Sequence, residues 1–178
     1  MGGLRCVDGS YLTVTPVACT DSVGAPYEIT LELHRDGAPY GSVGERCGHL
    51  LARLASGVDE ARRGSRRWAD PDDRFPCDEP DSELFSFRYR TRAGLGGGEL
   101  RCQLRTIPVW QPGPGEWRLT RRAYVEAWGA TGVGMRAVLT SAELSVFVRQ
   151  LVDEAEGCLK GRDSAQKRWR GSGHGDSR

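Results

Sequence analysis

Apolar and polar residues alternate along several short stretches of the chain, which is the pattern of half-buried β-strands. A weak alternation over residues 11–15 is followed by a clean one over 27–33. Arg35-Asp36-Gly37 then predicts a hairpin turn into a return strand near 39–43, because Asp-Gly suits tight turns. A second group of alternating stretches is separated by turns rich in Gly and Pro, and its predicted strands lie at 85–89, 100–110, 117–128 and 133–139.

Two other stretches have helical spacing. The first is predicted over 47–62 and ends at Gly64; its apolar side consists of Leu50, Leu51, Leu54 and Val58. The second begins at Thr140, which forms a predicted capping box with Glu143. Gly157 or Gly161 is expected to end it, and its core-facing stripe consists of Leu144, Phe147, Val148, Leu151 and Val152.

The order of elements favours an α+β fold, in which antiparallel sheets and two amphipathic helices are segregated. It also suggests a strands-helix pseudo-repeat with halves at 4–64 and 84–158, joined by an acidic loop at 65–83. We expect a single α+β domain over residues 1–158. The stretch 159–178 carries six basic residues against two acidic ones and has almost nothing to bury, so we expect a disordered basic tail.

Composition narrows the classes of function only slightly. The 178 residues carry a formal net charge of +1, which gives no general attraction to nucleic acid or to an anionic membrane. The chain begins without the apolar stretch of an export signal, and no apolar run approaches the ~20 residues of a membrane helix. The sequence therefore predicts a cytoplasmic protein without membrane contact, and it argues against nucleic acid as the main partner.

No set of catalytic or cofactor-binding residues is recognisable in the sequence. None of the six cysteines forms a Cys-x-x-Cys pair, so buried free thiols are favoured over disulfides or a metal site. His34, His49 and His174 stand outside any catalytic pattern, and Gly94–Gly98 lacks the Gly-Lys-Ser/Thr ending of a phosphate-binding loop. We therefore predict no catalytic residue, no cofactor and no metal.

The acidic loop is the most distinctive chemical feature of the chain. Its acids lack the spacing of a Ca²⁺ loop, which leaves a solvated connection or an anionic surface that meets a basic partner. Complementary charge of this kind speeds association between proteins. The candidate partner-binding residues are Asp70, Asp72, Asp73, Asp78, Glu79 and Asp81.

Three short segments resemble the WapI-type bacterial immunity proteins. Glu79-Pro80-Asp81-Ser82-Glu83-Leu84-Phe85-Ser86-Phe87 is similar to that family's Glu-Pro and Leu-Phe strand opening. A Gly-x-Leu strand at Gly98-Glu99-Leu100 and a Pro-x-Trp segment at Pro108-Val109-Trp110 are similar too, and the likeness covers about residues 25–157. The resemblance implies a small protein without catalysis of its own that binds and neutralises a co-encoded toxin.

The sequence thus leads to one main hypothesis and two alternatives. The main hypothesis is a non-catalytic binding protein of the toxin-neutralising kind, with a basic protein as its partner. The first alternative is an enzyme whose site is assembled from residues remote in sequence, with Arg66-Arg67 and Arg121-Arg122 as contributors. The second is a protein associated with nucleic acid through its basic tail, because basic residues beside Trp169 can bind single strands.

Overall fold

The chain folds into two four-stranded antiparallel sheets, each followed by a helix. The computed structural model describes residues 2–44, 47–64, 80–88, 97–129 and 132–171. The first half comprises β1 (Gly2–Arg5), β2 (Tyr11–Thr20), β3 (Pro26–Arg35), β4 (Ala38–Val43) and α1 (Cys47–Gly64). The second half comprises β5 (Ser82–Arg88), β6 (Glu99–Gln111), β7 (Glu116–Trp128), β8 (Gly134–Leu139) and α2 (Ser141–Gly171).

Both sheets are simple meanders in which each strand pairs with its neighbours in sequence. Their orders are β1-β2-β3-β4 and β5-β6-β7-β8, so the element order of the first half is repeated in the second. The expected α+β class and the strands-helix pseudo-repeat are therefore confirmed. The hairpin turn between β3 and β4 is also confirmed, because Asp36 and Gly37 have φ angles of 51° and 81°. Two positive φ angles in succession define the type I′ turn that suits a tight hairpin.

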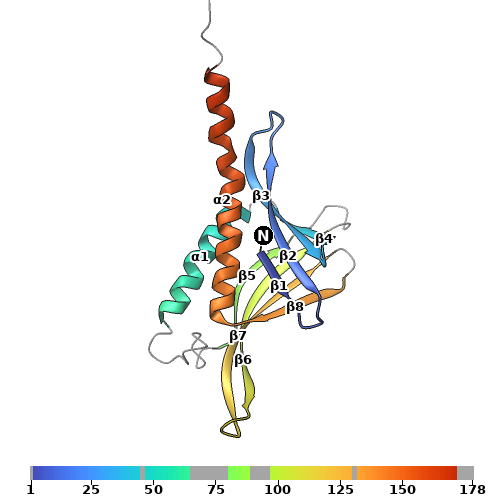
Figure 1. Ribbon diagram of the computed structural model, residues 1–178, viewed down its shortest axis with the longest axis vertical. Coiled ribbons are helices and arrows are strands. Elements are labelled where there is room, and N and C mark those ends of the chain that lie inside the picture. Colours follow the sequence, from blue (N-terminus) through green and yellow to red (C-terminus); the bar gives the residue numbers. More distant parts are fainter. Residues whose placement is uncertain (1, 45–46, 65–79, 89–96, 130–131, 172–178) are drawn as a thin grey trace, which may run out of the picture.

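The two helices lie on the same side of the molecule and pack against each other (Figure 1). A single apolar core fills the space between them and the sheets, since the core-facing residues of both sheets and of both helices form one buried cluster. The edge strands are β1 and β4 in the first sheet and β5 and β8 in the second. Among the described residues, every strand of the second sheet turns alternate side chains towards this core, as the period of two requires.

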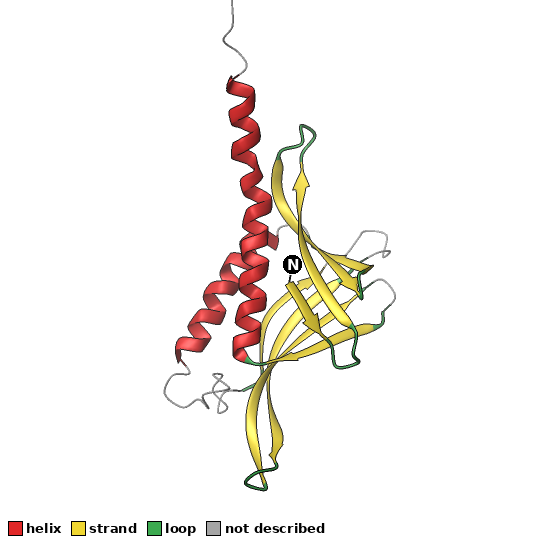
Figure 2. Cartoon of the chain, viewed as in Figure 1, coloured by secondary structure: helices red, strands yellow, loops and turns green. Residues whose placement is uncertain are grey.

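Each sheet extends its two middle strands into a long hairpin. The β2–β3 hairpin projects at one end of the molecule beside α2, and the β6–β7 hairpin projects at the opposite end (Figures 1 and 2). We call the β2–β3 pair the first hairpin, and we call the distal part of β6–β7, residues 106–121, the arm. The two hairpins occupy the same place in the repeated strand order, but the arm extends further beyond its neighbouring strand: Leu31 of β3 still pairs with β4, whereas the last β7–β8 pair is Ala123–Leu139.

The sheets meet at a seam of three glycines where β4 crosses the ends of β6 and β7. A Cβ atom built on Gly98 would lie 2.6 Å from the carbonyl oxygen of Ser42, and one on Gly129 would overlap the carbonyl oxygen of Tyr40. A Cβ atom on Gly41 would lie 3.1 Å from the Cα of Gly129. Backbone therefore touches backbone here, and only glycine allows so close an approach.

The structure corrects the expected end of the second helix. Helix α2 continues through Gly157 and Gly161 to Gly171, so residues 159–171 are helical where a disordered tail was expected. Gly157 keeps a helical backbone instead of the left-handed φ of a helix cap, and glycine inside a helix costs only about 1 kcal/mol. The start of β5 also differs, because Ser82 and Glu83 belong to the strand and not to the preceding loop.

Candidate functional site

The arm carries an exposed apolar face on the side that continues the protein core. Leu104 of β6 and Ala123 of β7 are buried, and the alternation of both strands carries this side outwards into the arm. Four residues form what we call the tryptophan face: Pro108, Trp110, Trp117 and Leu119. Trp117 is 68% exposed, Leu119 60% and Trp110 47%. A contiguous exposed apolar patch of this kind marks an interaction site more often than scattered surface residues do.

The two tryptophans are opposite each other on neighbouring strands. Trp110 pairs with Trp117 across the ladder, and their ring centroids lie 5.5 Å apart at an interplanar angle of 61°. An edge-to-face pair of this type stabilises a hairpin by about 1 kcal/mol. The pairing accounts for the geometry of the rings but leaves most of the Trp117 surface in contact with solvent.

The corresponding face of the first hairpin is covered by α2. Pro16 pairs there with Leu31, which also pairs with Val43 of β4, and the next pair outwards is Ala18 with Ile29. Pro108 and Leu119 of the arm, by contrast, lie beyond the last pairs that β6 and β7 make with β5 and β8. Leu31 and Ile29 are both completely buried. Helix α2 packs against β2 and β3, and the thiol of Cys158 donates a hydrogen bond of 3.5 Å to the carbonyl oxygen of Pro16.

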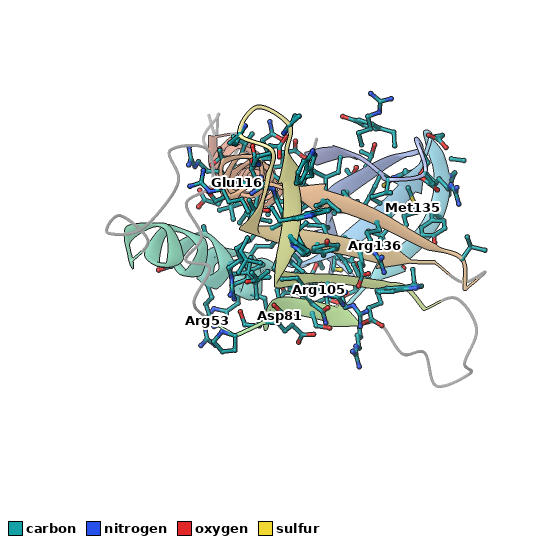
Figure 3. The ribbon with its side chains drawn as sticks, turned by 90° about the horizontal axis from the view of Figure 1, so that it is seen from below. Arg53, Asp81, Arg105, Glu116, Met135 and Arg136 are labelled. Carbon is teal, nitrogen blue, oxygen red and sulfur yellow. The ribbon has the colours of Figure 1, made fainter. Side chains whose placement is uncertain are left out.

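A clamp of hydrogen bonds fixes the base of the arm to the start of β5. Arg121 is fully buried, and its Nη2 donates to the carbonyl oxygen of Pro80 at 2.7 Å and to Oγ of Ser82 at 3.2 Å. Asp81 accepts from the backbone N–H of Thr106 at 3.0 Å, and Figure 3 shows Asp81 at the start of this strand. These bonds tie the root of the arm to a neighbouring strand, so the arm projects from a fixed base.

The outer face of the second sheet, opposite the core, carries a ladder of arginine and aromatic side chains. Arg101 lies over the ring of Trp128 at 4.5 Å from its centroid. Arg105 and Arg136 lie 5.2 Å and 5.9 Å from the ring centroid of Tyr124, and Figure 3 shows both arginines along this sheet. Such contacts between guanidinium groups and rings contribute about 0.5–1 kcal/mol each at exposed sites.

Glu126 joins these arginines into one network. Arg101 donates Nε and Nη2 to one carboxylate oxygen at 2.8 Å, and Arg136 donates Nε and Nη2 to the other at 2.7 Å and 2.6 Å. Burial alone raises the pKa of Glu126, but the hydrogen bonds and charges of the two arginines outweigh it and lower the pKa. The charged side chains of the ladder therefore bond largely to one another, which leaves this face less available to a partner than the arm.

A groove of about 640 Å³ lies where the edge strands β1 and β8 approach the start of α2. Its polar lining comes from Arg5, Glu143 and Gln150, together with the thiol of Cys6. Glu143 is engaged in the predicted capping box, because it accepts from the backbone N–H of Thr140 at 2.8 Å. Burial raises the pKa of the Cys6 thiol, which keeps it from acting as a nucleophile.

The cysteines within the described residues are free thiols. Burial raises the pKa of Cys47 to about 12, and burial likewise raises that of Cys102. A thiol that is neutral at physiological pH is a poor nucleophile and a poor metal ligand. In the parts of the chain that the structure describes, no three His, Cys, Asp or Glu side chains gather as a metal site would require.

The structure places only one of the predicted partner-binding residues. Asp81 lies at the clamp described above, while Asp70, Asp72, Asp73, Asp78 and Glu79 lie outside the described residues, as do Arg66-Arg67; Trp169 belongs to the last turn of α2. His34 is on the outer face of the first sheet opposite Thr13, His49 is in the first turn of α1, and His174 is outside the described residues. The acidic-surface hypothesis therefore stays a prediction.

Sequence reasoning missed the tryptophan face as a candidate site. Trp110 and Trp117 stood in predicted strands beside a Gly-Pro turn, and alternation alone did not show that their side would be exposed. The available signal was the length of the β6 and β7 stretches, 13 residues each, which exceeds the 6 residues of β8 beside them. A hairpin that extends beyond the neighbouring strands exposes the face that would otherwise pack on the core, unless another element covers that face.

Comparison with known proteins adds no assignment. No family model matches the chain. No curated protein and no solved structure matches it either. Within the described residues, neither helix has both the length and the apolar character needed to cross a membrane.

Proposed function

We propose that this protein is a non-catalytic binding protein whose partner docks on the tryptophan face of the arm. The exposure of Trp110, Trp117 and Leu119 carries this proposal, because these three apolar side chains are neighbours on one face of the arm. Tryptophan is enriched among the residues that dominate binding energy at protein interfaces. The fixed base of the arm adds to this, since a surface held in place before binding loses less entropy when a partner docks.

The resemblance to immunity proteins supplies the finer part of the proposal. It implies that the partner is a co-encoded toxin, and that binding takes place in the cytoplasm, where the chain neutralises it without catalysis. Pro108-Val109-Trp110, one of the segments that carry the resemblance, contributes to the tryptophan face. The acidic stretch remains a second predicted contact for a basic partner.

The test compares partner capture by the full chain and by two variants. Trp110→Ala with Trp117→Ala removes both exposed rings of the arm, and Tyr27→Ala removes a similarly exposed ring, 59%, from the first hairpin. Each tagged protein is incubated with a lysate of its native host, and the proteins retained in near one-to-one amount are identified by mass spectrometry. We expect a partner that is retained by the wild type and by Tyr27→Ala and lost by the arm variant.

Urea unfolding of the three proteins serves as the control for folding. Because the arm tryptophans are largely exposed, the arm variant should remain folded and lose about 1 kcal/mol of unfolding free energy, the value of the cross-strand pair. Equal retention by a folded arm variant, or no retained protein with the wild type, contradicts docking on the tryptophan face.

A further inference from the structure

We infer that the groove between β1 and β8 is a second binding site, which takes up an extended segment of another protein as an additional β-strand. The inference does not depend on docking at the arm, because none of the residues that line this groove belongs to the arm. It goes beyond the proposed function by adding a different mode of recognition, in which main chain pairs with the free edge of a sheet.

Strand β1 has one edge without a pairing strand. Cys6 directly follows β1 and continues its ladder with β2, because its N–H donates to the carbonyl oxygen of Ser10 at 2.8 Å. Successive residues of a strand point their main-chain groups to opposite edges, so Gly3, Arg5 and Val7 face away from β2. Among the described residues, the main-chain groups of Gly3 and Arg5 on this edge have no backbone partner.

Strand β8 turns a similar edge towards β1. The N–H of Val7 donates to the carbonyl oxygen of Arg136 at 2.8 Å, so Arg136 faces β1, and Val138, two residues further on, faces the same way. No other backbone hydrogen bond joins the two strands within the described ranges, although Figure 1 shows them side by side. The edges therefore meet at one hydrogen bond, and beyond it the groove opens between residues 3–7 and 138–139.

The groove has the size and the lining that a single strand needs. Its volume is about 640 Å³. A strand of four residues fills about 600 Å³, because it is about 13 Å long in a sheet with strands about 4.8 Å apart and faces about 10 Å thick. Three exposed valines line the groove: Val7, Val138 and Val146. An incoming strand with β-branched apolar residues at alternate positions would cover them.

Arg5 indicates the charge of one further position. Its side chain is exposed at the groove and has no ion-pair partner among the described residues. Glu143 also lines the groove, but its carboxylate already accepts from the N–H and the hydroxyl of Thr140 at 2.8 Å and 2.9 Å. An acid in the incoming strand would therefore complete the ion pair of Arg5. Antiparallel pairing with β1 is the more stable direction for this strand.

A second copy of the chain does not fit this groove through its sheet edges. Each edge strand of another copy carries a neighbouring strand behind it, β2 behind β1 and β7 behind β8. That neighbour would have to lie where the opposite wall of the groove stands, because the Val7–Arg136 hydrogen bond holds β8 beside β1. A single extended segment has no such neighbour, so it is the occupant that the groove accepts.

The test selects a ligand from random octapeptides displayed on phage and panned against the full chain. We expect enriched peptides with alternating β-branched residues and an acid. The most enriched peptide is labelled with a fluorophore, and its binding is followed by anisotropy. Arg5→Pro removes the outward N–H and places a ring on the edge, so it should weaken binding about thirtyfold or more. Arg5→Thr is the matched control; it keeps the N–H, loses the charge and should weaken binding about fivefold at most.

Further measurements separate loss of the edge from loss of the fold. The midpoint of urea unfolding of Arg5→Pro should stay close to that of the wild type, because the N–H of Arg5 faces away from β2. Amide hydrogen exchange, followed by NMR, should be fast at Gly3 and Arg5 in the free chain and about tenfold or more slower in the complex. A peptide methylated on its backbone nitrogens keeps its side chains but cannot donate to the edge, and it should not bind.

Several outcomes overturn the inference. Absence of enriched peptides, equal binding to Arg5→Pro, equal binding of the methylated peptide, or slow exchange at Gly3 and Arg5 in the free chain each contradicts strand addition. Self-association in sedimentation velocity that Arg5→Pro abolishes assigns the edge to a second copy. Trp110→Ala with Trp117→Ala should bind the peptide as the wild type does; loss of binding in this variant alone places the peptide on the arm, which contradicts the groove but not the proposed function.

Discussion

The two halves of this molecule share one topology and differ in what covers their long hairpins. In the first half, α2 lies along β2 and β3, and Leu31 is completely buried. In the second half, Leu119, which lies beyond the last β7–β8 pair, is 60% exposed beside two exposed tryptophans. The difference teaches that the same alternating pattern serves as core where a third strand and a helix accompany the hairpin, and as surface where the hairpin extends beyond its neighbouring strands.

The outer faces of the two sheets differ as well. The outer face of the first sheet is formed largely by Thr13, Thr15, Thr30 and Glu32, which are small or acidic. The outer face of the second sheet carries the arginine and aromatic ladder around Glu126. The arginine and aromatic ladder and the arm both belong to the second half. The long hairpin of the first half, by contrast, is largely covered by α2.

The largest predicted effect comes from truncating a buried leucine of the first hairpin, which we compare with the truncation of an exposed leucine of the arm. Leu31→Ala leaves a cavity under α2 and should reduce the unfolding free energy by about 3 kcal/mol. Leu119→Ala removes an exposed side chain and should change it by about 0.5 kcal/mol or less. Urea unfolding monitored by far-UV circular dichroism measures both. Similar losses in the two variants would mean that the arm face is covered in solution.

A second, smaller effect is expected on the outer face of the second sheet. Glu126→Gln removes the charge that pairs with Arg101 and Arg136, and we expect a loss of about 2 kcal/mol at pH 7. Glu99→Gln is the matched control, because the Glu99–Arg88 pair is more exposed and should contribute about 0.5 kcal/mol. A loss in the control as large as that in Glu126→Gln would show that burial of the carboxylate has no special effect.

The same pair of variants predicts how stability depends on pH. The pKa of Glu126 is lowered in the folded protein, so its stabilising effect is fully present above its unfolded pKa of about 4.3 and is lost as the pH falls through the folded pKa. The difference in unfolding free energy between wild type and Glu126→Gln should therefore shrink between pH 5 and the more acidic range. Urea unfolding at pH 7, 5 and 3 measures it, and a constant difference contradicts the prediction.

The smallest effects concern the N-termini of the two helices, which are capped in different ways. Thr140→Ala removes the hydroxyl that accepts from the N–H of Glu143 at 3.3 Å, and should cost about 1 kcal/mol. Glu28→Ala removes the carboxylate that accepts from the N–H of Gly48 at 3.1 Å, and should cost a similar amount. The midpoint of urea unfolding measures both effects. An unchanged midpoint for Glu28→Ala alone would mean that Glu28 of β3 does not cap α1.

The caps also show what sequence alone could predict. Thr140 and Glu143 are three residues apart, so the capping box of α2 was predicted from spacing and is confirmed. Glu28 and Gly48 are 20 residues apart, and their contact depends on the register of β3 and on the path of the chain into α1. Local chemistry is readable in a sequence, whereas contacts set by the packing of separate elements are not.

The same reasoning explains the strands and the candidate site. Alternation and turn residues predicted all of the strands except β1, whose short sequence Gly2–Arg5 has too few residues to show a period. Alternation could not show that Trp117 is exposed while Ile29 is buried, because that depends on which hairpin α2 reaches. The glycine signal for the end of α2 was also wrong, since Gly157 only lowers helix propensity and does not stop the helix.

The glycine seam limits how the molecule can change over time. At Gly98 and Gly129, even the smallest side chain would meet a carbonyl oxygen of β4. A substitution there cannot be absorbed by a neighbouring side chain, because the obstacle is main chain. The hairpins and outer faces of the two halves can therefore accept different side chains, whereas the joint between the halves accepts none at Gly98 and Gly129.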